Sequence, residues 1–191
     1  MKTLCRLCVV LTFSLFIASP ALAQSTSSTL LGVGLRHHAT PSVFTDYPFE
    51  DGDMSYGISY ELNDAAGYWQ IAVEYAANTA ASRTNSADYV VTPQLNLVIE
   101  DNFWRAGVGI AANYIEYETD AVAASEADAN TEASLENGWS DVYYQFLLGV
   151  CLPLGSMSLD IFAAYPFDDW GALDDFDAND IEIALWLKFS I

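Results

Sequence analysis

Apolar and polar residues alternate along much of the chain, most clearly at its C-terminal end. In residues 180–191 the odd positions are all apolar, and the even positions include Glu182, Trp186 and Lys188. Because successive side chains of a strand point to opposite faces, one face of this segment is apolar and the other carries a carboxylate and an ammonium. The pattern predicts a strand that separates apolar surroundings from a polar interior.

The same alternation occurs seven more times. The predicted strands cover residues 31–37, 54–62, 69–75, 89–99, 104–114, 142–151, 157–165 and 180–191. Most are close to the roughly 9–11 residues that a tilted strand needs to cross the hydrocarbon layer of a bilayer. The chain is therefore predicted to be all-β, an eight-stranded antiparallel up-and-down transmembrane β-barrel.

The predicted connections alternate in length. Long segments cover 38–53, 77–87, 116–141 and 166–179, whereas short turns cover 63–67, 100–102 and 153–156. Outer-membrane barrels have long external loops and short periplasmic turns, so this order places both termini of the predicted barrel domain on the periplasmic side. The composition of 116–141 predicts partial disorder. Pro93 lacks an N–H donor inside a predicted strand, which predicts a bulge or a local break there.

Aromatic and charged residues are sorted by position in this arrangement. The outward positions near the external rim are tyrosines, and those near the periplasmic rim are Trp69, Trp104 and Phe189. The tyrosines are Tyr56, Tyr75, Tyr89, Tyr114, Tyr144 and Tyr165. Such belts form where a ring is apolar and its polar group needs water. No outward strand position is charged, and a charge there would cost about 2–4 kcal/mol at the bilayer midplane.

The N-terminal segment has the pattern of a secretory signal peptide. A basic start is followed by a short apolar run, and Ala21-Leu22-Ala23 fits a cleavage site before Gln24. Residues 1–23 are thus predicted to be removed and residues 24–191 to form the barrel domain. Removing 23 of the 191 residues leaves 168, the size of one domain, with Cys151 as its single cysteine.

The charge balance excludes one class of partner. Removal of Lys2 and Arg6 leaves four basic residues against 26 acids, a net charge of −22. A chain this acidic is repelled by phosphates, so nucleic acid is not an expected partner. No apolar run after residue 23 is long enough for a transmembrane helix.

On its alternation, its loop order and its last strand, the chain resembles the small eight-stranded outer-membrane barrels of the OmpA and OmpX type. The resemblance covers the whole predicted mature chain and carries no diagnostic motif. In that family the final strand ends in an aromatic residue that the assembly machinery recognises. Here Ile191 is last and Phe189 stands two residues before it, a departure that weakens this part of the resemblance.

Seven charged residues are predicted to face the barrel interior, together with the amides Gln70, Gln94, Asn96 and Gln145. The charged residues are Arg36, Glu61, Glu74, Arg105, Asp160, Glu182 and Lys188. An eight-stranded barrel is narrow enough to be filled by side chains. We expect paired charges that plug the lumen, and a narrow proton or ion path is the alternative.

Three further groups could carry chemistry. His37 and His38 lie near Ser42 at the external end of the first strand, and we interpret them as surface histidines rather than catalytic groups. The acidic run 174–180 places Asp175, Asp177 and Asn179 at the first positions of a calcium loop. Asp180 and Trp186, however, occupy the glycine and glutamate positions of that loop, so weak divalent binding is the most it offers.

The third group is aromatic. Phe167, Trp170 and Phe176 lie in the last long connection, where they could cover the barrel mouth or form a contact patch.

These observations predict an integral protein of a Gram-negative outer membrane, with a structural or surface-interaction role, no catalytic residues and no cofactor. The expected partners are outer-membrane lipid, the barrel assembly machinery and weakly bound divalent cations. Two alternatives stay open: a lipid A-modifying barrel enzyme, and a soluble periplasmic lipocalin-like binder with its apolar face turned inward.

Overall fold

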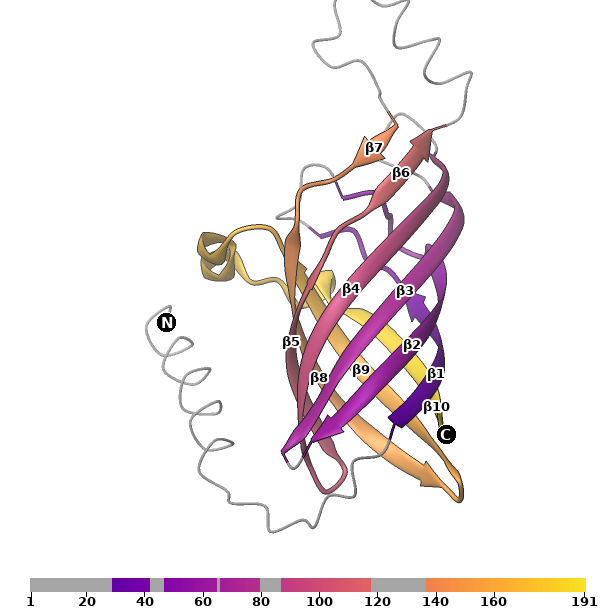
Figure 1. Ribbon diagram of the computed structural model, residues 1–191. Helices are drawn as coiled ribbons and strands as arrows, with labels where there is room; N and C mark the ends of the chain where they lie inside the picture. Colours follow the sequence, from indigo (N-terminus) through magenta and orange to yellow (C-terminus); the bar gives the residue numbers. More distant parts are fainter. Residues whose placement is uncertain (1–28, 42–46, 65, 80–86, 118–136) are drawn as a thin grey trace, which may run out of the picture.

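Eight long antiparallel strands, which we call the staves, form a barrel that is closed by hydrogen bonds between the strands labelled β3 and β4 in Figure 1. The computed structural model describes residues 29–41, 47–64, 66–79, 87–117 and 137–191, and the predicted signal peptide lies outside them. The strands are β1 (Thr29–His37), β2 (Met54–Asp64), β3 (Gly67–Thr79), β4 (Ala87–Asp101), β5 (Trp104–Ala111), β6 (Tyr114–Tyr117), β7 (Gly138–Trp139), β8 (Tyr143–Leu154), β9 (Met157–Phe167) and β10 (Glu182–Ser190).

The staves follow the chain in order, as an up-and-down barrel requires. The hydrogen-bonded order is β3-β2-β1-β10-β9-β8-β5-β4, and the short β6 and β7 extend β5 and β8 beyond the barrel body. Every pairing is antiparallel. The predicted eight-stranded antiparallel barrel is therefore confirmed. No helix in the described part of the chain is both long and apolar enough to span a membrane.

Short turns join the staves at one end of the barrel and long connections at the other (Figure 1). Two of the turns contain residues with positive φ, Asn102 at 55° and Gly155 at 74°, a conformation that tight hairpins require. The first strand begins and the last strand ends at the short-turn end of the barrel, where the Ile191 amide donates to the Thr29 carbonyl at 3.2 Å. The predicted alternation of long and short connections is confirmed.

The strand that follows β4 is interrupted opposite Pro93, as the missing N–H donor of this proline predicts. β5 stops at Ala111, and pairing with β4 resumes at Tyr114 without a change of register. The Ala112 amide donates to the Pro93 carbonyl at 3.3 Å, but Pro93 returns no donor to Ala112. A register shift also occurs between Ala87 and Tyr89, at the beginning of β4.

The longest predicted loop is shorter than expected. Residues 114–117 and 138–139 pair with each other and extend the wall, so the unpaired segment does not begin at residue 116. The prediction of partial disorder concerns mostly residues 118–136, which lie outside the described residues.

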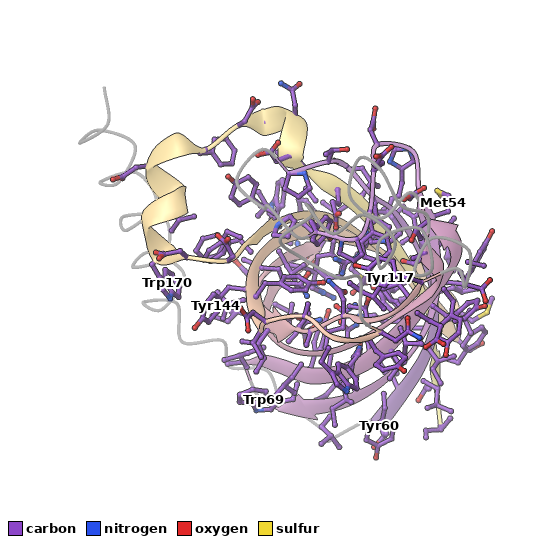
Figure 2. The ribbon with its side chains drawn as sticks, turned by 90° about the horizontal axis from the view of Figure 1, so that it is seen from above. Met54, Tyr60, Trp69, Tyr117, Tyr144 and Trp170 are labelled. Atoms are coloured by element: carbon purple, nitrogen blue, oxygen red, sulfur yellow. The ribbon has the colours of Figure 1, made fainter. Side chains whose placement is uncertain are left out.

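The last long connection contains two short 3₁₀ helices, η2 (Trp170–Asp175) and η3 (Ala178–Asp180). The Asp169 side chain caps η2 and the Asp177 side chain caps η3, each by accepting a backbone N–H two residues later. This connection, which we call the β9–β10 arm (residues 168–181), projects to the side of the barrel rather than across its mouth (Figures 1 and 2).

Candidate functional site: the polar lumen

The inward face of the barrel is polar and enclosed. All seven charged residues that the alternation places inward are buried: Arg36, Glu61, Glu74, Arg105, Asp160, Glu182 and Lys188. The amides Gln70, Gln94, Asn96 and Gln145 are buried beside them. A buried charge is tolerated only when it is paired and hydrogen-bonded, so the partners of these groups decide whether the lumen is stable.

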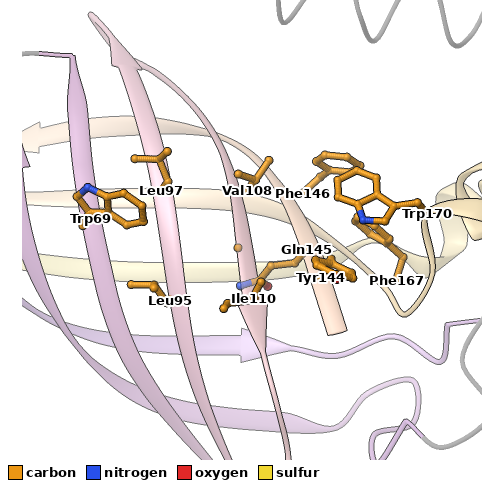
Figure 3. A pocket seen from close by; sticks show the side chains of 11 residues that line it. Trp69, Leu95, Leu97, Val108, Ile110, Tyr144, Gln145, Phe146, Phe167 and Trp170 are labelled. Atoms are coloured by element: carbon orange, nitrogen blue, oxygen red, sulfur yellow. The ribbon is translucent and has the colours of Figure 1, made fainter. Parts of the chain in front are cut away.

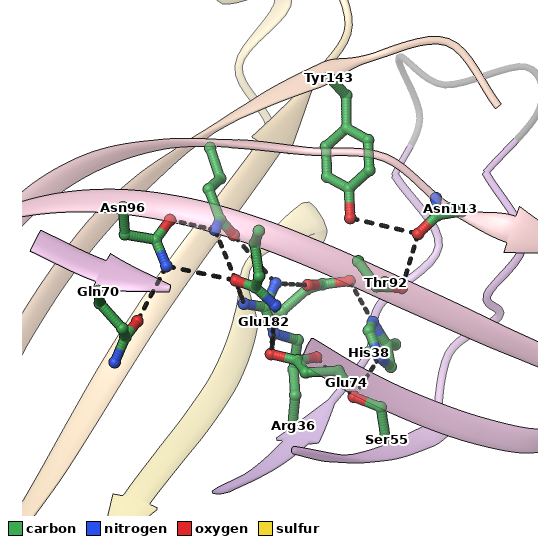
Figure 4. A network of polar contacts seen from close by, with 12 residues as sticks. Arg36, His38, Ser55, Gln70, Glu74, Thr92, Asn96, Asn113, Tyr143 and Glu182 are labelled. Atoms are coloured by element: carbon green, nitrogen blue, oxygen red, sulfur yellow. Dashed lines mark hydrogen bonds and ion pairs between the residues drawn. The ribbon is translucent and has the colours of Figure 1, made fainter. Parts of the chain in front are cut away.

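An upper cluster, which we define as Arg36, His38, Glu74 and Glu182, lies toward the long-connection end (Figure 4). The Arg36 guanidinium contacts Glu74 Oε1 through Nε and Glu182 Oε2 through Nη1, both at 3.2 Å. Its terminal nitrogens also donate to the side-chain carbonyls of Gln145 at 3.0 Å and Gln94 at 3.1 Å. The fixed fork of arginine thus connects side chains from five strands.

His38 lies between two hydrogen-bonding groups in this cluster. Its Nδ1 is 2.9 Å from Glu182 Oε1, and its Nε2 is 3.0 Å from the Ser55 hydroxyl oxygen. The Ser55 hydroxyl itself donates to Glu74 Oε2 at 2.7 Å. Ser55 and His38 thus connect the Glu74 and Glu182 carboxylates, both of which also contact Arg36.

A lower cluster, which we define as Glu61, Arg105, Asp160 and Lys188, lies nearer the short turns. Lys188 Nζ is 2.6 Å from both Glu61 Oε1 and Asp160 Oδ2. It also donates to the Tyr68 hydroxyl at 2.9 Å and lies 4.2 Å from the centre of that ring. Arg105 Nε lies 3.8 Å from Asp160 Oδ2. This cluster contains two cations and two carboxylates.

An apolar layer separates the two clusters. Trp186 and Phe162 fill the section together with small residues of neighbouring strands, including Ala72 and Ala164. The Trp186 indole lies against Gly34 and Gly57, where an added Cβ would collide with its ring. A large ring can occupy so narrow a lumen because the adjacent strands present glycine to it.

A chain of amides passes this layer and joins the clusters. Gln145 Nε2 donates to Asn96 Oδ1 at 2.7 Å, and Asn96 Nδ2 donates to Gln70 Oε1 at 2.9 Å. Gln70 Nε2 then donates to Glu61 Oε1 of the lower cluster at 2.8 Å. Amide groups hydrogen-bond without carrying net charge, so this connection extends the polar plug and leaves its charge balance unchanged.

The mouth of the lumen is closed by the first long connection. Phe49 stacks on the His38 ring with centroids 3.7 Å apart, and the Tyr47 hydroxyl donates to Glu182 Oε1 at 2.8 Å. Burial, and then the nearby Glu182 carboxylate, raise the pKa of Tyr47 well above its usual value, so this hydroxyl keeps its proton. Tyr143 contacts Tyr47 edge-on at 5.7 Å and completes the cap.

The interpretation of His38 as a surface histidine was wrong. His38 is buried and hydrogen-bonded to Glu182, whereas His37 is exposed, and Ser42 lies outside the described residues. The sequence did carry a signal, since His38 has the same parity as Arg36 and continues the inward face. The residues that sequence reasoning missed were Tyr47 and Phe49, because they reach the lumen from an irregular loop.

Ser55, His38 and Glu182 have the order of a serine–histidine–carboxylate triad. The Ser55 hydroxyl, however, donates to Glu74 Oε2, so its proton is directed to that carboxylate and not to His38 Nε2 as in a triad. Ser55 is also only 1% exposed beneath the aromatic cap.

The acidic arm offers no assembled metal site among the described residues. No three His, Cys, Asp or Glu side chains of that part of the chain gather around a common point. Asp177 Oδ1 instead accepts from the backbone and side-chain nitrogens of Asn179, at 2.9 and 2.8 Å. The Asp175 side chain lies outside the described part, and weak divalent binding remains a prediction.

The three aromatic residues predicted in the last long connection, Phe167, Trp170 and Phe176, do not cover the barrel mouth. Phe167 and Trp170 pack beside Tyr144 and Phe146 on the outer wall, and Trp170 itself is exposed. Phe176 covers Tyr165, which faces outward as predicted but is only 5% exposed. Of the two roles considered for these aromatic residues, this arrangement is compatible only with a contact patch on the outer wall.

The rest of the outer wall is apolar and exposed (Figure 2). Its strand positions include Ile58, which is 67% exposed, and Leu148, which is 55% exposed. Tyr56 pairs with Tyr75, and Tyr89 stacks between Tyr75 and Tyr114, which forms a continuous tyrosine row near the long-connection end. Trp69 and Trp104 are exposed near the short turns.

The chain matches no family model and no curated protein. The fold and the site define the class of the protein: a closed eight-stranded antiparallel barrel whose lumen is filled by two clusters of paired charged groups and whose outer wall is apolar. Its resemblance to the OmpA and OmpX type stays a prediction from the sequence.

Proposed function

We propose that this chain is an integral outer-membrane β-barrel protein with a plugged lumen, and that its role is structural or surface-interacting rather than catalytic. The single observation that supports the proposal is the inversion of the two faces. Large apolar side chains are exposed on the outside, while the seven charged side chains of the lumen are enclosed; the exposed Asp88, Glu100 and Asp101 lie at the two ends of β4. In water this wall would be an apolar patch far larger than a typical monomer exposes, whereas in a bilayer it is the expected surface.

The lipocalin-like alternative has no support from the lumen. A small-molecule binder of that kind needs an apolar cavity with a few polar groups, and here the interior is occupied by paired charges, amides and Trp186. The enzyme alternative has the serine–histidine–carboxylate order in its favour, but its hydrogen-bond directions and burial oppose it.

Cell fractionation combined with gel mobility tests the proposal. We expect the protein in the outer-membrane fraction, and we expect the unboiled form to migrate differently from the boiled form because closed barrels resist detergent unfolding. Recovery in the periplasm without detergent would refute the membrane assignment. Planar-bilayer recording is the companion experiment: the capped and plugged lumen predicts no conductance above the lipid background.

A further inference from the structure

The outer wall carries a groove of about 260 Å³ that ends at the β9–β10 arm (Figure 3). Two rows of outward side chains border it. One row runs from Trp69 through Leu97 and Val108 to Phe146, and the other from Leu95 through Ile110 and Tyr144 to Phe167. Trp170 of the arm closes the end where the two rows meet the aromatic group.

The register of the strands explains the shape of the groove. Its floor is the intervening row of inward residues, Asn96, Gly109 and Gln145, which present only backbone to the outside. One border has rings at both ends, Trp69 and Phe146, and aliphatic residues between them; the other is aliphatic at Leu95 and Ile110 and aromatic at Tyr144 and Phe167. The resulting slot is long, narrow and nearly free of polar surface.

The direction of the groove suits a chain-like occupant. Trp69 lies near the short-turn end of β3, whereas Phe146 and Phe167 lie near the long-connection ends of β8 and β9. The slot therefore climbs obliquely along the wall that the proposed function places in lipid. Its volume is just below the 300–1,000 Å³ typical of pockets for compact ligands, which favours a single extended chain over a ring system.

The arm adds a charge preference at the upper end. Asp168 and Asp169 are exposed and directly precede Trp170, which puts two carboxylates next to the closing ring. The charge of this segment repels an anionic head group and attracts an ammonium. An indole beside charged groups is also the usual arrangement at a membrane interface.

We propose that this groove binds one acyl chain of a membrane lipid whose head group carries an ammonium and lies against the β9–β10 arm. The inference rests on the proposed function, because it takes the outer wall to face lipid. It goes further by assigning one position on that wall, and one head-group chemistry, to a bound lipid.

Native mass spectrometry of the full-length protein tests it. The protein is released from nanodiscs of equal parts of phosphatidylethanolamine and phosphatidylglycerol. We expect one retained phospholipid per protein, with phosphatidylethanolamine favoured. Val108→Trp fills the centre of the groove and should reduce retention at least tenfold. Val33→Trp is the matched control on the far wall, where Val33 is 51% exposed, and should leave retention unchanged.

Asp168→Asn tests the head-group part. We expect the preference for phosphatidylethanolamine over phosphatidylglycerol to fall by roughly two- to fivefold, the range of one exposed ion pair. Equal retention by the two tryptophan variants, or a preference for phosphatidylglycerol, would overturn the inference. A dimer mass that disappears in Val108→Trp would also overturn it, in favour of a second copy of the chain.

Gel mobility of the same samples separates this failure from that of the proposed function. A heat-modifiable, membrane-inserted protein that retains no lipid contradicts only the groove assignment. A protein that does not enter nanodiscs contradicts both.

Discussion

Replacing Lys188 by methionine should be among the most damaging single changes in the barrel. The ammonium lies 2.6 Å from Glu61 and 2.6 Å from Asp160, and Glu61 is 0% exposed. Removing one partner of a buried ion pair leaves an uncompensated charge and typically costs about 3–5 kcal/mol. Arg105, 3.8 Å from Asp160, compensates only that second carboxylate.

Urea unfolding in lipid vesicles measures this effect. With a slope of about 2 kcal/mol/M, the expected loss lowers the midpoint by roughly 2 M. Glu61→Gln in the Lys188→Met background should recover part of the loss, because it removes the stranded charge and keeps the shape of the side chain. Leu187→Met, the outward neighbour on β10, is the control and should cost less than about 1.5 kcal/mol.

The result that would refute this reasoning is a Lys188→Met variant within about 0.5 kcal/mol of the parent, with no recovery in the double variant. Such a result would mean that water or alternative partners already satisfy Glu61 and Asp160. The lower cluster would then not be the enclosed ion-pair network that the distances describe.

Three further changes test other parts of the structure. Gly57→Ala brings a Cβ to 2.8 Å from Trp186 Cη2 and should cost about 1–3 kcal/mol in the same unfolding assay; Trp186→Phe in that background should recover part of it, and no recovery would locate the strain elsewhere. Ser55→Ala should cost about 1–3 kcal/mol by leaving Glu74 Oε2 and His38 Nε2 without their Ser55 contact, yet leave lipid A unchanged by mass spectrometry; altered lipid A would support the enzyme alternative. Phe176→Ala uncovers Tyr165 and should speed proteolysis within residues 168–181 severalfold while the barrel stays intact; an unchanged rate would show that the arm is held by other contacts.

The alternation of the strands was sufficient to predict the barrel and the direction of its charges. A period of two admits only two orientations for each strand, and the charged residues in the middle of a strand share one parity, as Glu182 and Lys188 of β10 do. Closure then forces all of these groups into one lumen. This is why the inward set was predicted correctly even though no motif identifies it.

The partners inside the lumen were not predictable in the same way. Whether Arg36 meets Glu74 and Glu182, or Glu61 and Asp160, depends on the stagger of strands around the closed barrel, which alternation does not encode. The loop contributions were also missed, because Tyr47 and Phe49 lie in an irregular segment with no periodic signal. Tyr165 shows the converse case: its outward parity was right, but a distant loop residue, Phe176, covers it.

Whether the outer wall faces lipid is tested most directly by the accessibility of spin labels along β2. Single cysteines at 54, 56, 58, 60 and 62, in a Cys151→Ser background, are spin-labelled in vesicles and exposed to oxygen and to a water-soluble nickel complex. If the wall faces lipid, oxygen contact peaks at Ile58 and nickel contact is lowest there, with the reverse toward both ends of the strand. Nickel contact at Ile58 equal to that at the strand ends would place this wall in water instead.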